Sequence, residues 1–208
     1  MELLNDAMTF AIAAHGGALR KGDGSPAILH AMEAAAVAAT LTGDAEVLAA
    51  AVLHDTVEDA GADLEELRAR FGPRVAALVG AETEDKMRHL PPAASWRARK
   101  EAAIQRLRRA EDPGVAVVTL GDKLSNLRSF YRNKERQGSA MWAHFHQTDP
   151  EEHHWYYRTI ADVLSPLAAS AAWREYDWLI RKVFDENEDE SASSARAAAE
   201  TRVRRDPR

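Results

Sequence analysis

An apolar run that leads into a cluster of ionisable side chains constrains this chain more than any other feature. The run Val47–Leu53 contains only Ala, Val and Leu, and the next six residues, His54 to Asp59, read His-Asp-Thr-Val-Glu-Asp. Buried charged groups are costly unless they are paired or bind a metal. We expect a core helix that continues through the cluster and ends by Gly61, so that His54 and Glu58 lie one turn apart. The segment therefore predicts a polar site at the end of a buried helix.

The composition favours helices over strands. Hydrophobic residues make up 46% of the chain and are dominated by Ala and Leu, whereas aromatic residues make up only 7%. Ala and Leu are good helix formers, and strands are usually richer in β-branched and aromatic residues. The apolar run Val115–Leu120 fits a buried strand locally, but Leu124 and Leu127 continue it at helical intervals. We therefore predict an all-α helical bundle.

Local signals predict several boundaries within this bundle. Asp44 is expected to cap the helix that contains the first apolar run. Residues 87–95, which include two adjacent prolines, are expected to form a loop before a basic amphipathic helix from Trp96 to Arg109. The aromatic-rich segment 141–184 is expected to form two helices with a break near Pro166.

Length and charge limit the organisation and the partners. The chain has 208 residues, enough for one sizeable core, and we expect one domain, residues 1–184, followed by a charged and disordered tail, residues 185–208. A net charge of -6 argues against binding to duplex nucleic acid, which requires a basic face. The chain has no cysteine, no apolar stretch long enough for a bilayer and no signal-peptide pattern at its start. We expect a cytoplasmic protein without membrane contact; a homo-oligomer is possible.

Two imidazoles and two carboxylates from three predicted helices could hold one divalent cation. His30 opens one helix, and His54 and Asp55 close another. Asp122 follows the run Val115–Leu120. Taken singly, a histidine near a helix start is more often a hydrogen-bonded core residue, and an aspartate is often a helix N-cap. Nitrogen and oxygen ligands without a thiolate suit Mn²⁺, with Fe²⁺ or another divalent cation as alternatives, better than a closed zinc site.

Glu58 and Asp59 lie just past these candidate ligands. Alone, they would be read as a solvated helix face. Beside a cation, they could hold a water molecule, accept its proton or protonate a leaving oxygen. This arrangement makes the hydrolysis of a phosphate ester or anhydride the natural reaction.

Four segments together resemble the successive motifs of HD-domain hydrolases. They are Arg20–His30, His54–Asp59, Glu82–Lys86 and Leu120–Arg128. The likeness is strongest to the hydrolase domain of RelA/SpoT homologues and to the stand-alone small alarmone hydrolases. It extends over about residues 5–184, and the segment His54–Asp59 is its most specific part.

The resemblance implies an HD helical bundle with a metal site in its core and assigns roles to individual residues. The residues at the positions of the family's Mn²⁺ ligands are His30, His54, Asp55 and Asp122. Those at the positions of its catalytic acids are Glu58 and Asp59. Those at its nucleotide-binding positions are Arg20, Lys21 and Asn126. In that family, water attacks the 3′-pyrophosphate of ppGpp and releases pyrophosphate and GDP, so a small nucleotide is the expected partner.

Three positions depart from the family pattern, and all of them spare the expected ligands and acids. Ala27 replaces a usual tyrosine, Ala31 a proline and Gly121 an alanine. Because Ala27 lies beside the nucleotide-binding loop, the departures bear on the substrate more than on the metal. One alternative is an HD phosphohydrolase of a deoxynucleotide, a nucleoside monophosphate or NADPH. Another is a non-catalytic nucleotide sensor, which would have no need of acids such as Glu58 and Asp59.

Overall fold

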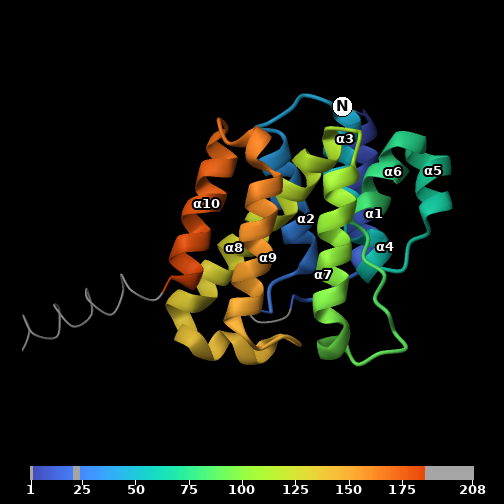
Figure 1. Cartoon of the computed structure of the whole chain (residues 1–208). Helices are drawn as coiled ribbons and strands as arrows, with labels where there is room; N and C mark the ends of the chain where they lie inside the picture. Colours follow the sequence, from blue (N-terminus) through green and yellow to red (C-terminus); the bar gives the residue numbers. More distant parts are fainter. Residues whose placement is uncertain (1, 21–23, 186–208) are drawn as a thin grey trace, which may run out of the picture.

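Helices alone build the part of the chain that the computed structural model describes, residues 2–20 and 24–185 (Figure 1). Apart from one isolated bridge between Leu19 and Pro26, every regular element there is helical. The prediction of an all-α fold is therefore confirmed for these residues. The expected tail lies outside the described residues from position 186 onward.

The helices follow one another with short connections. The N-terminal part contains α1 (Glu2–His15), α2 (Ala27–Ala38), α3 (Ala45–Leu53), α4 (Thr56–Asp59), α5 (Leu64–Phe71) and α6 (Pro73–Glu82). The C-terminal part contains α7 (Pro92–Arg109), α8 (Gly114–Gln137), the 3-10 helix η1 (Gly138–His144), α9 (Pro150–Val163), the 3-10 helix η2 (Ser165–Leu167) and α10 (Ala171–Phe184). The expected break near Pro166 is confirmed, because η2 separates α9 from α10.

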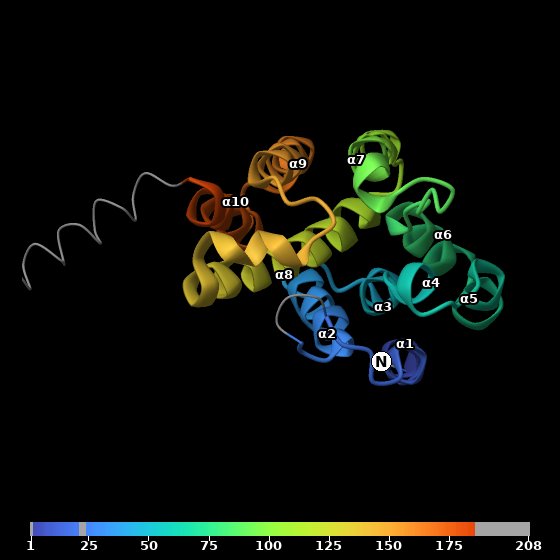
Figure 2. The same ribbon diagram turned by 90° about the horizontal axis from the view of Figure 1, so that it is seen from below.

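The central element is α8. It contacts α2, α3, α6 and α10, and Figure 2 shows it between α2 and α3 on one side and the layer of α7, α9 and α10 on the other. Its run Val115–Leu120 is helical and mostly buried, as the helical interpretation predicted. Because α8 touches most of the bundle, a polar residue on it can meet groups from several helices.

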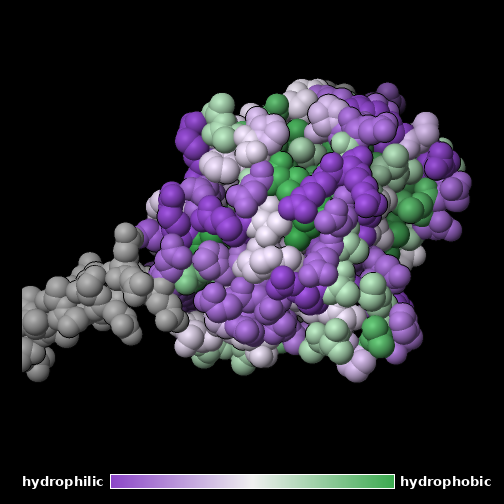
Figure 3. Space-filling model, viewed as in Figure 1, coloured by the Kyte–Doolittle hydropathy of each residue, from purple (hydrophilic) through white to green (hydrophobic). Residues whose placement is uncertain are grey.

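Aromatic rings fill the space between α8 and the C-terminal layer. Phe130 on α8 packs edge-to-face against Trp142 and Tyr157, with ring centroids 5.5 Å apart in each pair. Trp96 on α7 packs in the same way against Tyr156 on α9, at 6.1 Å. The surface in Figure 3 is mostly hydrophilic, with hydrophobic residues visible between α7 and α9. These rings fix the C-terminal helices against α8.

In the described residues, none of the helices combines the length and the apolarity that crossing a membrane requires.

The helix over the ionisable cluster is interrupted where the sequence predicted continuity. α3 ends at Leu53, and α4 begins at Thr56 as a separate short helix. Thr56 Oγ1 donates to the carbonyl of Leu53 at 2.7 Å, and His54 Nδ1 lies 2.8 Å from the carbonyl oxygen of Ala51. Side chains thus bond to the carbonyl oxygens that would accept hydrogen bonds from backbone N–H groups in a continuing helix. The prediction of one continuous helix was wrong, whereas the predicted end by Gly61 is confirmed, because α4 ends at Asp59.

The expected loop at residues 87–95 is shorter than predicted. α7 begins at Pro92, four residues before the predicted start at Trp96. Proline is tolerated in the first helical turn because its missing N–H would have no partner within the helix. The first helical bond here runs from the N–H of Ser95 to the carbonyl of Pro91 at 3.1 Å. The two prolines therefore start the helix instead of excluding it.

Gly121 allows α8 to approach α2 closely. A Cβ atom added at this position would lie 2.6 Å from the carbonyl oxygen of Ala34 on α2, which is far inside van der Waals contact. The next residue of α8 is Asp122, and His30 lies one turn before Ala34 on α2. The glycine therefore helps to bring these two polar groups together.

We expect Gly121→Ala to lower the free energy of unfolding by about 1–2 kcal/mol, measured by urea denaturation. Overpacking against a backbone atom costs roughly 1–3 kcal/mol. The higher helix propensity of alanine offsets at most about 1 kcal/mol of this cost. The matched control is Gly80→Ala in α6, where the added Cβ would lie 3.4 Å from the flexible Leu64 side chain. Equal stabilities of the two variants would contradict the prediction.

Candidate metal centre and the surrounding cavity

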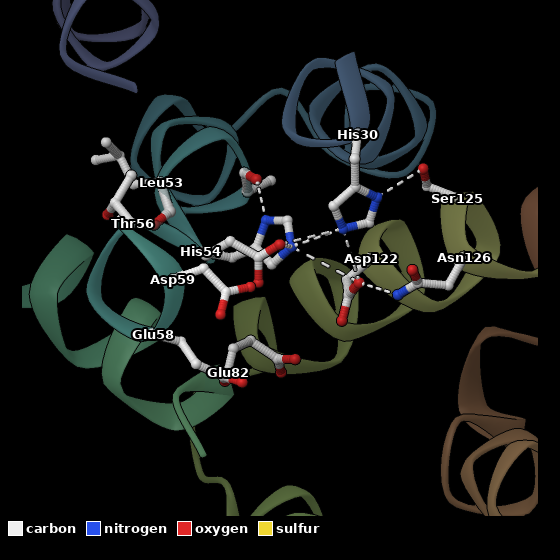
Figure 4. Close-up of polar contacts among 12 residues, drawn as sticks. His30, Leu53, His54, Thr56, Glu58, Asp59, Glu82, Asp122, Ser125 and Asn126 are labelled. Atoms are coloured by element: carbon white, nitrogen blue, oxygen red, sulfur yellow. Dashed lines mark hydrogen bonds and ion pairs between the residues drawn. The ribbon is translucent and has the colours of Figure 1, made fainter. Parts of the chain in front are cut away.

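Three helices direct polar side chains to one point in the bundle. His30 lies in the first turn of α2, His54 follows the last residue of α3, and Asp122 lies on α8. Figure 4 shows the two imidazoles and the carboxylate of Asp122 pointing toward one another. The His54 ring is held by its Nδ1 contact with the Ala51 carbonyl, so its Nε2 faces the other two groups.

The candidate ligand atoms lie close together. His30 Nε2 is 3.1 Å from His54 Nε2 and 3.1 Å from Asp122 Oδ1. His54 Nε2 is 3.6 Å from Asp122 Oδ1. Asp55 Oδ2 lies 3.4 Å from His30 Nε2 and 3.3 Å from His54 Nε2. The structure thus brings together all four residues that the sequence suggested as ligands.

These residues fit a divalent cation. With bonds of about 2.1 Å, neighbouring ligands of an octahedral cation lie roughly 3 Å apart, close to the separations found here. One ligand atom from each of His30, His54 and Asp122 lies within 4.8 Å of the others, and all three residues are buried. Asp55 is within reach of both imidazoles, and its side chain is 28% exposed. Two nitrogens and two carboxylates leave positions for water or substrate.

Lys123 compensates the charge of Asp122. Its ammonium group contacts Asp122 Oδ2, which leaves Oδ1 directed at the imidazoles. Burial by itself would raise the pKa of Asp122, but the Lys123 ammonium and the hydrogen bonds of His30 and His54 together outweigh it, so the pKa lies well below its usual range. Burial would lower the pKa of Lys123, but Asp122, together with Tyr156, Glu82 and Tyr157, raises it well above the ordinary value. Asp122 is therefore held as a carboxylate even though it is buried.

Glu82 is a further buried acid near this pair. Its Oε2 lies 4.0 Å from Lys123 Nζ, and its Oε1 accepts a hydrogen bond from Thr119 on α8. Burial raises the pKa of Glu82 above its ordinary value. The end of α6 is thus linked to α8 beside the candidate ligands.

The segment after α6 holds the two candidate acids of α4. Lys86 Nζ lies 2.8 Å from Glu58 Oε1 and 2.8 Å from Asp59 Oδ1. The backbone N–H of Glu84 donates to Glu58 Oε2 at 3.0 Å. Burial raises the pKa of Glu58, and the Lys86 ammonium opposes this shift. The two acids differ in surroundings, because the side chain of Glu58 is 17% exposed and that of Asp59 is 57% exposed.

Asn126 connects the loop before α2 to the candidate centre. Arg20 Nη2 donates to Asn126 Oδ1 at 2.7 Å, and Asn126 Nδ2 donates to Asp122 Oδ1 at 2.5 Å. The structure therefore places Arg20 and Asn126 together, next to a candidate ligand. Lys21, the third residue suggested for nucleotide binding, lies outside the described residues.

A cavity of about 530 Å³ joins all these groups. It is lined by the four candidate ligands, by Glu58 and Asp59, and by Arg20 and Asn126. Ala27 also lines it. The aromatic part of the lining consists of Trp96, Phe130, Phe145, His153, Tyr156 and Tyr157. The cavity therefore offers charged groups to a polar ligand and aromatic faces to a ring.

Three residues of the site had no role in the sequence interpretation. Glu82 and Lys86 belong to one of the recognised motifs, and Lys123 follows a candidate ligand directly. Their place in these motifs was the only available signal. A single Glu or Lys has many ordinary explanations on a helix surface, and only the fold shows that these side chains face the cavity.

Comparison with known proteins places the chain in a family. A sequence model of the HD domain matches residues 7–170. A GTP pyrophosphokinase of Streptomyces coelicolor is 34% identical over 174 residues, which are 82% of this chain and 20% of the relative. A guanosine-3′,5′-bis(diphosphate) 3′-pyrophosphohydrolase of Aquifex aeolicus is 37% identical over 137 residues, which are 65% of this chain and 19% of the relative. The chain spans about a fifth of the length of these curated relatives.

Two solved structures have a similar fold. A metazoan ortholog of SpoT that hydrolyses ppGpp superimposes with a TM-score of 0.69 and 24% identity, over 88% of this chain and 96% of that one. This identity is low enough that the match shows the fold alone. A protein from Listeria monocytogenes EGD-e gives a TM-score of 0.65 and 28% identity, over 76% of this chain and 99% of that one. From the extent of the sequence match and the shared fold, the chain belongs to the HD domain family.

Proposed function

We propose that this chain is a metal-dependent phosphohydrolase that acts on a pyrophosphorylated nucleotide, with ppGpp as the leading substrate. One observation carries the proposal: the Nε2 atoms of His30 and His54 lie 3.1 Å apart and 3.1–3.6 Å from carboxylate oxygens of Asp55 and Asp122, in a cavity that Glu58 and Asp59 also line. The domain responsible would comprise residues 1–184, which include the matched segment 7–170. A nucleotide substrate of this kind is consistent with action in the cytoplasm.

His30, His54, Asp55 and Asp122 would hold the cation, which we propose to be Mn²⁺, with Fe²⁺ as an alternative. Such a cation polarises a phosphoryl oxygen and lowers the pKa of a water molecule. The protein contributes the position of the ligands: α2 and α8 lie close at Gly121, and Lys123 together with the two imidazoles keeps Asp122 ionised.

Glu58 is the proposed base. A carboxylate whose pKa is raised by burial is a better proton acceptor than an exposed one, and Glu58 remains accessible from the cavity. The water oxygen would bond to the phosphorus attached to the 3′ oxygen, and the bond between that phosphorus and the 3′ oxygen would break. The water proton would pass to Glu58 and from there, by way of Asp59, to the leaving 3′ oxygen, so that both carboxylates end the reaction as they began it. The products would be GDP and pyrophosphate.

The substrate assignment rests on the cavity and on the relatives. Arg20 can bind phosphate oxygens through its planar guanidinium group, and Asn126 offers an amide beside it. Lys21 is proposed to add a second positive charge. Two relatives, 37% and 35% identical, are named as guanosine-3′,5′-bis(diphosphate) 3′-pyrophosphohydrolases, which favours ppGpp.

A product-resolved assay with Mn²⁺ tests the proposal. Purified protein would be incubated with ppGpp, pppGpp, NADPH and a set of deoxynucleotides and nucleoside monophosphates, and the products separated by chromatography. GDP and pyrophosphate from ppGpp are the expected result. Turnover of another nucleotide only would identify a different HD phosphohydrolase. Tight nucleotide binding without products would identify a sensor and contradict the proposed enzyme.

We expect Lys86→Met to move the acidic limb of the kcat/KM profile to higher pH. Glu58 must be deprotonated to accept a proton, and the Lys86 ammonium lowers its pKa. Without that charge the pKa of Glu58 rises, so activity is lost at a higher pH on acidification. Lys134→Met is the control and is expected to keep the wild-type profile, since Lys134 lies outside the cavity and donates to the carbonyl of Lys182 at 3.1 Å. A limb that stays in place or moves to lower pH in Lys86→Met would be evidence against Glu58 as the base.

A further inference from the structure

A chain of hydrogen bonds leads from the imidazole of His30 to α10. His30 Nδ1 lies 2.9 Å from Ser125 Oγ (Figure 4), and Ser125 Oγ donates to Glu33 Oε2 at 2.6 Å. Arg128 Nη1 donates to the other oxygen of Glu33 at 3.1 Å. Arg128 Nε and Nη2 donate to the two carboxylate oxygens of Glu175, at 2.7 Å each. Five side chains thus connect a candidate ligand to the last described helix.

The helical spacing of these residues makes the chain possible. Glu33 follows His30 by three residues on α2, and Arg128 follows Ser125 by three residues on α8, so each pair shares a helix face. His30 and Ser125 are 5% and 2% exposed, whereas the side chains of Glu33 and Arg128 are 28% and 30% exposed. The chain therefore runs from the buried centre to the surface, through groups that do not line the cavity.

The hydrogen positions in this chain follow from the chemistry of its groups. A carboxylate only accepts hydrogen bonds, so the single hydroxyl hydrogen of Ser125 goes to Glu33. The serine oxygen can then offer His30 only a lone pair, and His30 Nδ1 must carry a hydrogen. In a neutral imidazole this leaves the lone pair on Nε2, the atom that lies 3.1 Å from His54 Nε2 and Asp122 Oδ1.

We infer that Ser125 and Glu33 are positioning residues of the proposed metal site and that the Arg128–Glu175 ion pair fastens them to α10. They hold His30 in the tautomer whose Nε2 can bind a cation, and they fix the orientation of its ring. His54 obtains the same tautomer from the backbone carbonyl of Ala51. The inference rests on the proposed function, because the tautomer of His30 matters only if this residue is a ligand.

The tautomer of His30 can be read in the metal-free protein by ¹⁵N NMR of the histidine rings, at a pH where this ring is neutral. The wild type is expected to carry the proton on Nδ1. Ser125→Ala removes the acceptor, and Glu33→Ala frees the serine hydroxyl to donate to Nδ1. Both variants are expected to move the proton of His30 toward Nε2. Glu33→Gln keeps an acceptor oxygen and is expected to restore the wild-type tautomer, while His54 provides an internal control.

Mn²⁺ affinity, measured by competition with a chelator, is the second readout. Loss of an outer partner of a ligating histidine typically weakens metal binding by about 10–100-fold, which we expect for Ser125→Ala and Glu33→Ala. Glu175→Gln breaks the connection to α10 and is expected to weaken binding measurably, by less than this range. Asp177→Asn is the matched control, because Asp177 lies on the same helix and pairs with Arg158 at 2.7 Å instead. It is expected to leave the affinity unchanged.

The two readouts separate failure of this inference from failure of the proposed function. A wild-type tautomer and a wild-type affinity in both Ser125→Ala and Glu33→Ala would overturn the inference. Equal affinities in Glu175→Gln and Asp177→Asn would overturn the part that concerns α10. If the wild type binds no Mn²⁺, the proposed function fails, while the NMR comparison still decides whether Ser125 and Glu33 set the tautomer. Should Ser125→Ala not fold, Glu33→Ala provides the same comparison, because the side chain of Glu33 is partly exposed and its removal disturbs the core less.

Discussion

Replacing Glu58 by glutamine is expected to lower kcat by about 10²–10⁴-fold while the protein keeps its metal, because a positioned base contributes about that much. Glutamine preserves the shape of the side chain and can still accept the N–H of Glu84, but it cannot accept a proton from water. Glu58 is not among the four groups that converge at the candidate centre, so the metal site itself should be preserved.

The measurement combines steady-state kinetics with metal analysis of the same preparation. Glu46→Gln serves as the control, since Glu46 is a carboxylate on α3 that pairs with Arg74 at 2.9 Å, away from the cavity. It is expected to keep wild-type activity. A Glu58→Gln variant with activity within tenfold of the wild type would show that another group accepts the proton.

Asp55→Ala is expected to remove metal binding, with a loss of Mn²⁺ affinity greater than about 100-fold. Outer partners of a metal ligand are worth about 10–100-fold, and the loss of a direct ligand should exceed this range. The variant also leaves the buried imidazoles of His30 and His54 without a carboxylate that lies 3.3–3.4 Å from them. Activity should disappear together with the metal.

Equilibrium dialysis against Mn²⁺ followed by elemental analysis measures this loss. Asp59→Ala is the matched comparison, because it removes a carboxylate four residues later that pairs with Lys86 and does not contact the imidazoles. It should bind metal like the wild type. A full metal content in Asp55→Ala would remove Asp55 from the ligand set.

Local sequence patterns were sufficient to predict much of the fold. Asp44 caps α3 as expected, with its carboxylate 3.0 Å from the N–H of Glu46. The run Val115–Leu120 is helical because the periodicity continues to Leu124 and Leu127. These features depend on residues a few positions apart. Hydrogen bonds and helix faces at that range can be predicted from the sequence alone.

The break between α3 and α4 shows where local reasoning ends. The pattern of apolar and polar residues is compatible with one continuous helix, but the side chains of His54 and Thr56 bond to carbonyl oxygens of α3. Whether these side-chain bonds form in place of the backbone hydrogen bonds of a helix depends on burial and on the packing of neighbouring helices. The start of α7 at Pro92 is a similar case, because the proline pair is compatible with either a loop or a first turn.

The sequence by itself determined that the chain is helical and which residues could form a polar site, because residue type and spacing carry that information. Only the tertiary structure decided that His30, His54, Asp55 and Asp122 meet, that Lys86 joins the two acids, and that Ser125 and Glu33 stand behind His30. These contacts join residues as many as 95 positions apart. They form because small residues such as Gly121 let α2 and α8 approach, a condition that no single segment expresses.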